Sequence, residues 1–172
     1  MKISQRVLDK RFMQLAFDKA SEHLGSTKEN PSVGCVVVKN NTVISSGKTS
    51  LNGRPHAETN ALNKKKNFNG STIYVTLEPC AHHGLTPPCI NIIKKKNVKK
   101  VYYSIPDPDK RTFNKAKQLL SQSNIKVNIG IMKIDSLNFY KSYILSKDKQ
   151  KLPYTDVKIA ISKDYFSENK KA

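Results

Sequence analysis

Tryptophan is absent from this chain of 172 residues, cysteine is rare, and no long apolar run occurs. Three cysteines, an odd number, do not favour a disulfide framework and fit a reducing compartment. Without a run of about 18 apolar residues, no transmembrane helix is expected. The first residues lead into an amphipathic segment rather than into the apolar core of a signal peptide. We therefore expect a cytoplasmic protein with no membrane partner.

Acidic residues are also few: 13 Asp and Glu stand against 31 Lys and Arg, which gives a formal net charge of +18. Such a balance can indicate a nucleic-acid partner. Here the excess is mainly lysine in scattered runs, whereas nucleic-acid sites favour arginine interleaved with aromatic rings. We interpret the lysine runs as solvated surfaces and do not expect a nucleic-acid partner. The positive field would still favour an anionic small-molecule substrate.

The apolar pattern along the chain switches between the spacing of surface helices and the runs typical of buried strands. Helices are expected at 7–24, 56–65, 89–95, 113–121 and 136–146. Strands are expected at 33–38, 42–46, 71–77, 99–105 and 125–129. Strand and helix alternate from residue 71 onward, which predicts an α/β fold with a central sheet covered by helices.

Three residues stand in contexts typical of a catalytic zinc site. His56 opens the string His-Ala-Glu, and Cys80 and Cys89 follow, Cys80 directly after a proline. One imidazole and two thiolates leave the fourth position of a tetrahedral zinc open, which distinguishes a catalytic site from a structural one. A His-x-Glu motif followed by Pro-Cys and a second Cys is the signature of zinc nucleobase deaminases. The pattern predicts a metal-binding hydrolase, a hydrolytic deaminase.

Glu58 is the expected proton carrier. Residues two apart on a helix point about 200° away from each other, so Glu58 is not expected to share the metal with His56. Its carboxylate can take a proton from water and pass it to the substrate, acting first as base and then as acid. The alternative is a structural zinc site with His82, His83 or His23 as fourth ligand, which would leave Glu58 without a role. Cys35 lies in an apolar run and is expected in the core.

The spacing of the two cysteines carries a family resemblance. Eight residues separate Cys80 from Cys89, whereas transfer-RNA adenosine deaminases and cytidine-type deaminases usually have Cys-x-x-Cys. The string 79–89 resembles the deaminase domain of the bifunctional riboflavin-biosynthesis deaminase/reductase. The strings 30–38, 53–58 and 76–80 are similar to the same family in the same order. The resemblance implies a cytidine deaminase-like, three-layer α/β/α fold with a central mixed sheet.

The resemblance also implies an activity. The expected substrate is a phosphorylated pyrimidine, 2,5-diamino-6-(5-phosphoribosylamino)pyrimidin-4(3H)-one, and the product is 5-amino-6-(5-phosphoribosylamino)uracil with release of ammonia. One Zn²⁺ per chain is implied as cofactor, and NADPH only if a complete reductase domain were present. Residues 1–148 would form the deaminase domain. Residues 149–172 would be a linker and the truncated start of a reductase-like domain.

Five positions are implied as substrate-binding: Asn30, Thr49, Ala57, His82 and Leu85. Asn30 also fits a turn residue before a proline, and His82 also fits a residue that braces its loop through a hydrogen bond. The family usually has a histidine where Thr49 stands and a basic residue where Leu85 stands. The metal chemistry is therefore expected to be intact, while the groups that contact the substrate are altered.

A second departure lies at 109–116, where the family has a further proline and two glycines, and this chain has Lys110, Asn114 and Ala116. Two other functions stay open. One is a catalytically weakened, zinc-binding partner of a separate reductase, and the other is a tRNA or nucleobase deaminase. A homodimer also stays open.

Overall fold

The computed structural model describes residues 3–147 and, further on, Thr155, Val157 and Ile159. The predicted segment 149–172 therefore lies almost wholly outside the described residues. The elements follow one another as α1 (Gln5–Ser21), β1 (Gly34–Lys39), β2 (Thr42–Lys48), the 3₁₀ turn η1 (Leu51–Gly53), α2 (Ala57–Leu62), β3 (Thr72–Leu77), α3 (Cys89–Lys95), β4 (Lys100–Ile105), α4 (Lys115–Ser121), β5 (Lys126–Ile129), α5 (Lys133–Phe139) and α6 (Lys141–Lys147).

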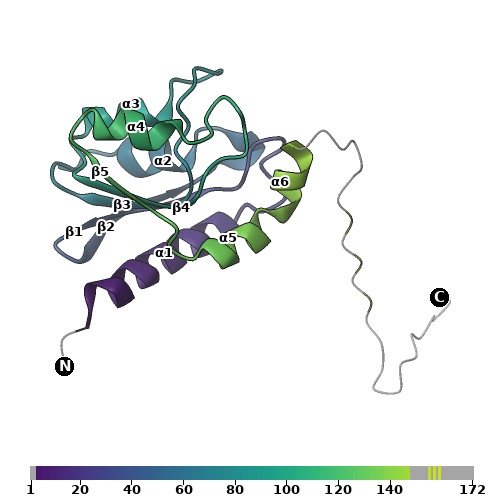
Figure 1. Ribbon diagram of the computed structural model, residues 1–172, viewed down its shortest axis with the longest axis horizontal. Helices are drawn as coiled ribbons and strands as arrows, with labels where there is room; N and C mark the ends of the chain where they lie inside the picture. The colour runs from purple at the N-terminus through teal and green to yellow at the C-terminus, as the bar shows by residue number, and fades with distance from the viewer. Residues whose placement is uncertain (1–2, 148–154, 156, 158, 160–172) are drawn as a thin grey trace.

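The strands form one mixed sheet in the order β2-β1-β3-β4-β5. β1 is antiparallel to both of its neighbours, and β3, β4 and β5 run parallel. Figure 1 shows α2, α3 and α4 on one face of the sheet, and α1 and α5 on the other. The predicted three-layer α/β/α architecture with a central mixed sheet is confirmed.

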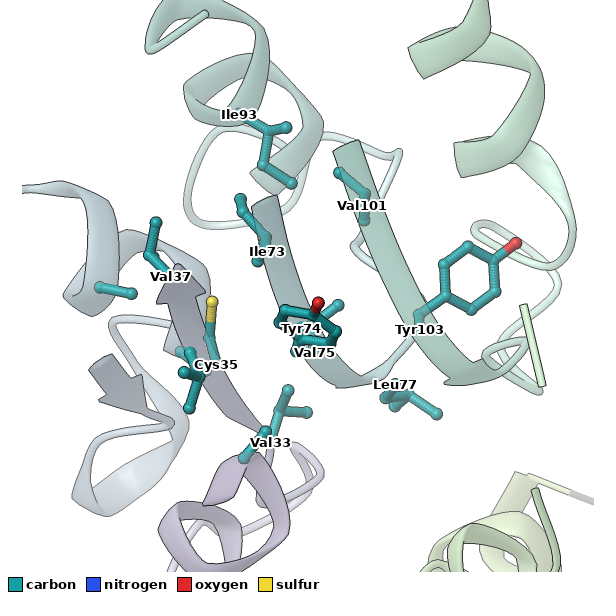
Figure 2. Close-up of a cluster of buried hydrophobic side chains, with 14 of the residues drawn as sticks. Val33, Cys35, Val37, Ile73, Tyr74, Val75, Leu77, Ile93, Val101 and Tyr103 are labelled. Carbon is teal, nitrogen blue, oxygen red and sulfur yellow. The ribbon is translucent and has the colours of Figure 1, made fainter. Parts of the chain in front are cut away.

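The core has two halves because successive strand residues point to opposite faces of the sheet. On the face under α3, Ile73 of β3 pairs with Val101 of β4, and Ile93 of α3 lies over them (Figure 2). On the other face, the ring of Tyr74 packs against Phe12 of α1 and stacks on Tyr102. The near-continuous apolar run of β1 is explained by this double coverage.

Cys35 is fully buried in β1 among apolar side chains (Figure 2), so the predicted core position is confirmed.

Two predicted helices end differently in the structure. The helix expected at 136–146 is split into α5 and α6 at Tyr140, whose buried hydroxyl contacts the hydroxyl of Thr76 and donates to the carbonyl of Ser32. The helix expected at 56–65 ends at Leu62. Beyond it, Lys64 and Lys66 donate to carbonyl oxygens of the edge strand β2. These lysines cover an exposed strand edge, a common protection against strand pairing between molecules.

Within residues 3–147, no helix has both the length and the apolar character needed to cross a bilayer.

Candidate metal centre and active site

The structure brings the three predicted metal ligands together. The Nδ1 atom of His56 lies 3.6 Å from the Sγ of Cys80 and 3.4 Å from the Sγ of Cys89. All three ligand atoms lie within 4.8 Å of one another. Zn–N and Zn–S bonds of ordinary length in tetrahedral geometry would put nitrogen and sulfur about 3.6 Å apart. The donor set and its spacing therefore fit zinc.

Secondary-structure ends place these ligands. His56 is the residue just before α2, Cys80 follows the end of β3, and Cys89 is the first residue of α3. The backbone N–H of Cys89 donates to the Sγ of Cys80 at 3.2 Å. The long loop between the cysteines thus closes on itself at the metal centre.

No fourth protein ligand joins this group among the described residues. The Nδ1 of His82 lies 2.9 Å from the hydroxyl of Thr112, and the Nδ1 of His23 lies 2.7 Å from the carbonyl oxygen of Thr49. The alternative of a structural zinc site finds no support in this geometry, because three ligands leave a coordination position open.

Glu58 is almost completely buried, with 3% of its surface exposed, beside the three ligands. Burial, followed by the negative charge of the nearby Cys80 thiolate, raises the pKa of its carboxyl group to about 7. A carboxyl group that titrates near neutrality can both accept and return a proton. The location and the pKa both suit the predicted proton carrier.

The two thiols differ in acidity. A hydrogen bond from the Cys89 thiol, followed by the contact with His56, lowers the pKa of Cys80 to about 4 despite its burial. The same hydrogen bond, together with burial, raises the pKa of Cys89 well above its ordinary value. Zinc binds thiolates, so its binding must displace the proton that the Cys89 thiol retains.

A cavity opens over this centre. Its lining residues come from the loops at one end of the sheet and from α6: Glu29, Asn30, Pro31, Val33, Thr49, Arg54, His56, Glu58, Leu77, Glu78, Cys80, His82, Gly84, Thr86, Asp107, Asp109, Arg111, Tyr143 and Lys147. Three of the predicted substrate contacts, Asn30, Thr49 and His82, are among them. Ala57 is fully buried and Leu85 is 89% exposed, and neither lines the cavity.

Thr49 is held by the backbone around it. Its hydroxyl accepts the N–H of Val33 and donates to the carbonyl of Pro31, and only 1% of its surface is exposed. The hydroxyl proton of Thr49 is thus already used in the hydrogen bond to Pro31. The side chain of Asn30 packs against Gly53, where an added Cβ would lie 2.4 Å from Nδ2. Gly53 has a φ of +88°, which favours glycine in addition to the close packing.

Sequence reasoning assigned no role to Glu78, although its carboxylate organises the loop that faces the metal. It accepts backbone N–H groups from Asp107 and Asn114 on Oε2 and from Ala116 on Oε1. Asn114 stands in the left-handed region with φ +59°, where asparagine is the usual substitute for glycine. An asparagine at this position can therefore adopt the left-handed backbone conformation that glycine adopts most readily. The signal in the sequence was Glu78 itself, an acidic residue at the end of a buried strand.

Comparison with known families shows which family the chain belongs to. Residues 6–105 match the family described as the cytidine and deoxycytidylate deaminase zinc-binding region. All three candidate metal ligands lie within the matched segment. The chain belongs to this deaminase family.

Relatives within the deaminase family include proteins of riboflavin biosynthesis. The chain is 38% identical to riboflavin biosynthesis protein RibD of Haemophilus influenzae over 154 residues, which cover 89% of this chain and 41% of that protein. It is 40% identical to the diaminohydroxyphosphoribosylamino-pyrimidine deaminase of Buchnera aphidicola over 119 residues, which cover 69% of this chain and 81% of that protein.

The solved structure of Acinetobacter baumannii RibD is similar to this deaminase fold with a TM-score of 0.80 and 40% identity, covering 85% of this chain and 42% of that chain. The predicted cytidine deaminase-like fold is confirmed by this match. The chain spans about two fifths of the length of the RibD proteins that it matches.

Proposed function

We propose that this chain catalyses the zinc-dependent hydrolytic deamination of 2,5-diamino-6-(5-phosphoribosylamino)pyrimidin-4(3H)-one, with release of ammonia, in riboflavin biosynthesis. The observation that carries the proposal is the convergence of His56, Cys80 and Cys89 beside the buried Glu58. His56, Cys80 and Glu58 also line the cavity. The identity of 40% to a diaminohydroxyphosphoribosylamino-pyrimidine deaminase over 81% of that protein supports the substrate class.

His56, through Nδ1, and the thiolates of Cys80 and Cys89 would hold one zinc ion per chain. Bound zinc lowers the pKa of a coordinated water towards neutrality and so supplies the nucleophile for hydrolysis. The three protein ligands together carry two negative charges, which neutralise the ion and favour its retention. The N–H of Cys89 further stabilises the Cys80 thiolate.

Glu58 would move the protons. Its carboxylate would take a proton from the attacking water and deliver it to the ring nitrogen of the pyrimidine. It would then take the remaining proton of the added hydroxyl group and deliver it to the amino group, which leaves as ammonia. Only 3% of the surface of Glu58 is exposed, which limits contact of this carboxylate with bulk water. Asn30 and His82, which line the cavity, would contact the pyrimidine.

Ammonia release by the zinc-loaded chain with the diaminopyrimidine ribotide tests the proposal, with cytidine and tRNA as competing substrates. We expect turnover of the ribotide alone. Glu58→Gln is the matched control, because it keeps the shape of the side chain and removes the proton acceptor. We expect the variant to retain zinc and to lose about 100- to 10,000-fold in kcat.

Two outcomes would contradict the proposal. Turnover of tRNA or cytidine in preference to the ribotide would reassign the substrate. No turnover with zinc fully bound would favour the zinc-binding partner of a separate reductase. As part of the proposal, residues 1–148 form the deaminase unit, and a homodimer or a separate reductase is the expected protein partner.

A further inference from the structure

The proposed substrate carries a phosphate, and three cationic side chains line the cavity: Arg54, Arg111 and Lys147. Arg111 forms an ion pair with Asp109, whose carboxylate accepts hydrogen bonds from both Nε and Nη2 of the guanidinium. The ammonium group of Lys147 lies over the ring of Tyr143, at 5.2 Å from the ring centre. Arg111 is thus neutralised, and Lys147 is held over the aromatic ring at the end of α6.

Arg54 differs from both. Over residues 3–147, no carboxylate lies within ion-pair distance of its guanidinium. Its Nη1 donates to the hydroxyl of Thr86 at 2.9 Å. Its Nη2 lies 3.8 Å from the position that a Cβ on Gly84 would take. The guanidinium is therefore fixed against the loop between the two cysteines, half-buried, with donor capacity left over.

The second close contact of the Arg54 guanidinium is with His56, and it does not use the remaining N–H donors. The Nη1 of Arg54 lies 3.4 Å from the Nε2 of His56, while the Nδ1 of His56 faces the two cysteine sulfurs. A histidine that binds a metal through Nδ1 carries its proton on Nε2, so that two donors face each other there. A planar guanidinium with unused donors beside a metal centre is suited to an anion that accepts two hydrogen bonds.

We propose that Arg54 binds the phosphate group of the substrate and makes this chain selective for the phosphorylated pyrimidine. This inference rests on the proposed function. It gives the cavity a positive charge from Arg54, which contacts Thr86 of the loop between the cysteines, whereas Leu85 of that loop is 89% exposed and does not line the cavity. Thr86 holds one end of the guanidinium and leaves the remaining N–H groups for the phosphate oxygens.

Isothermal titration calorimetry on the zinc-loaded Glu58→Gln protein tests the proposal, because this variant should bind the ligand while converting it far more slowly than the wild type. The ligands are the diaminopyrimidine ribotide and the same compound with ribose but without phosphate. Arg54→Gln should weaken binding of the phosphorylated ligand about 10- to 100-fold and leave the unphosphorylated ligand unaffected. Arg54→Lys keeps the charge without the planar fork and should give a smaller loss. Arg11→Gln, which removes an equal charge from the exposed side of α1, should change neither.

Equal weakening of both ligands by Arg54→Gln, or of neither, would overturn the proposal. Failure of the Glu58→Gln protein to bind the phosphorylated ligand more tightly than the unphosphorylated one would overturn it as well. Zinc content measured on each variant separates a loss of phosphate contact from a loss of metal. If the wild type releases no ammonia but its binding remains selective for the phosphorylated ligand and depends on Arg54, the proposed reaction is rejected. The inference about Arg54 would then still stand.

Discussion

The Nδ1 atom of His82 lies 2.9 Å from the Oγ1 atom of Thr112, which is fully buried. This hydrogen bond joins the loop between the two cysteines to the loop that follows β4. It fixes the ring orientation of His82 and directs the opposite ring nitrogen, Nε2, away from Thr112. Both interpretations of His82 therefore have a physical basis: its Nδ1 atom braces the loop, and the residue also lines the cavity.

Thr112→Val should lower kcat/KM for the proposed substrate up to about 10-fold, because valine has the same shape and lacks the hydroxyl that orients His82. Steady-state kinetics of the zinc-loaded protein measures this effect. Thr112→Ser retains the hydroxyl and should stay close to the wild type. Equal kinetics for the valine and serine variants would show that the orientation of His82 does not matter for activity.

The ion pair of Asp109 and Arg111 should appear in the pH dependence of stability. Arg111 holds the pKa of the Asp109 carboxyl well below its usual value of about 3.9. A depressed folded-state pKa stabilises the protein above the unfolded-state value and loses this contribution as pH falls towards the folded-state value. Arg111→Gln should therefore be less stable than the wild type at pH 6, by less than about 1 kcal/mol because Arg111 is exposed.

The difference in the free energy of unfolding between Arg111→Gln and the wild type should shrink as pH falls below about 4. Urea unfolding from pH 6 downward is the measurement. Lys110→Gln removes the same charge from an exposed neighbour and serves as the control for net charge. A stability difference between Arg111→Gln and the wild type that stays constant with pH would contradict the effect of Arg111 on the pKa of Asp109.

Glu78→Gln should destabilise the fold by about 1–3 kcal/mol. The carboxylate of Glu78 is only 3% exposed and accepts hydrogen bonds from three backbone N–H groups. In the glutamine variant, the amide NH₂ group would take the place of one oxygen and would point at a backbone N–H, so that two donors would meet without an acceptor. Urea unfolding of the zinc-loaded variant measures the loss. Glu29→Gln, a change at an exposed position, should stay within about 0.5 kcal/mol of the wild type. Similar stability of the two variants would contradict the bracing role of Glu78.

Cys80→Ser should lose zinc, and with it the stability that zinc binding contributes to folding. Elemental analysis is expected to find one zinc per wild-type chain and much less in the variant. Chelator should lower the melting temperature of the wild type and leave that of Cys80→Ser unchanged. Cys35→Ala, a change at a cysteine buried in the core, should keep full zinc content. Loss of zinc from Cys35→Ala alone would contradict the ligand assignment.

Much of the fold could be predicted because its elements have local signals. The run of valines in β1 and the apolar segments of β3 and β4 predicted strands within one or two residues of their observed bounds. The split at Tyr140 could not be predicted, because the contacts of its hydroxyl with Thr76 and Ser32 join residues far apart in the chain. Beyond the early end of α2, Lys64 and Lys66 likewise contact a strand that is distant in the sequence.

The sequence by itself determined the candidate metal ligands and the candidate proton carrier. His56, Cys80, Cys89 and Glu58 could be named in advance, because their order and residue types follow from the coordination chemistry of zinc and from proton transfer. Only the tertiary structure decided what surrounds them. Orientation and pairing of side chains depend on contacts between distant loops. The pairing of His82 with Thr112 and the contact of the Arg54 guanidinium with Thr86 therefore have no local signature in the chain.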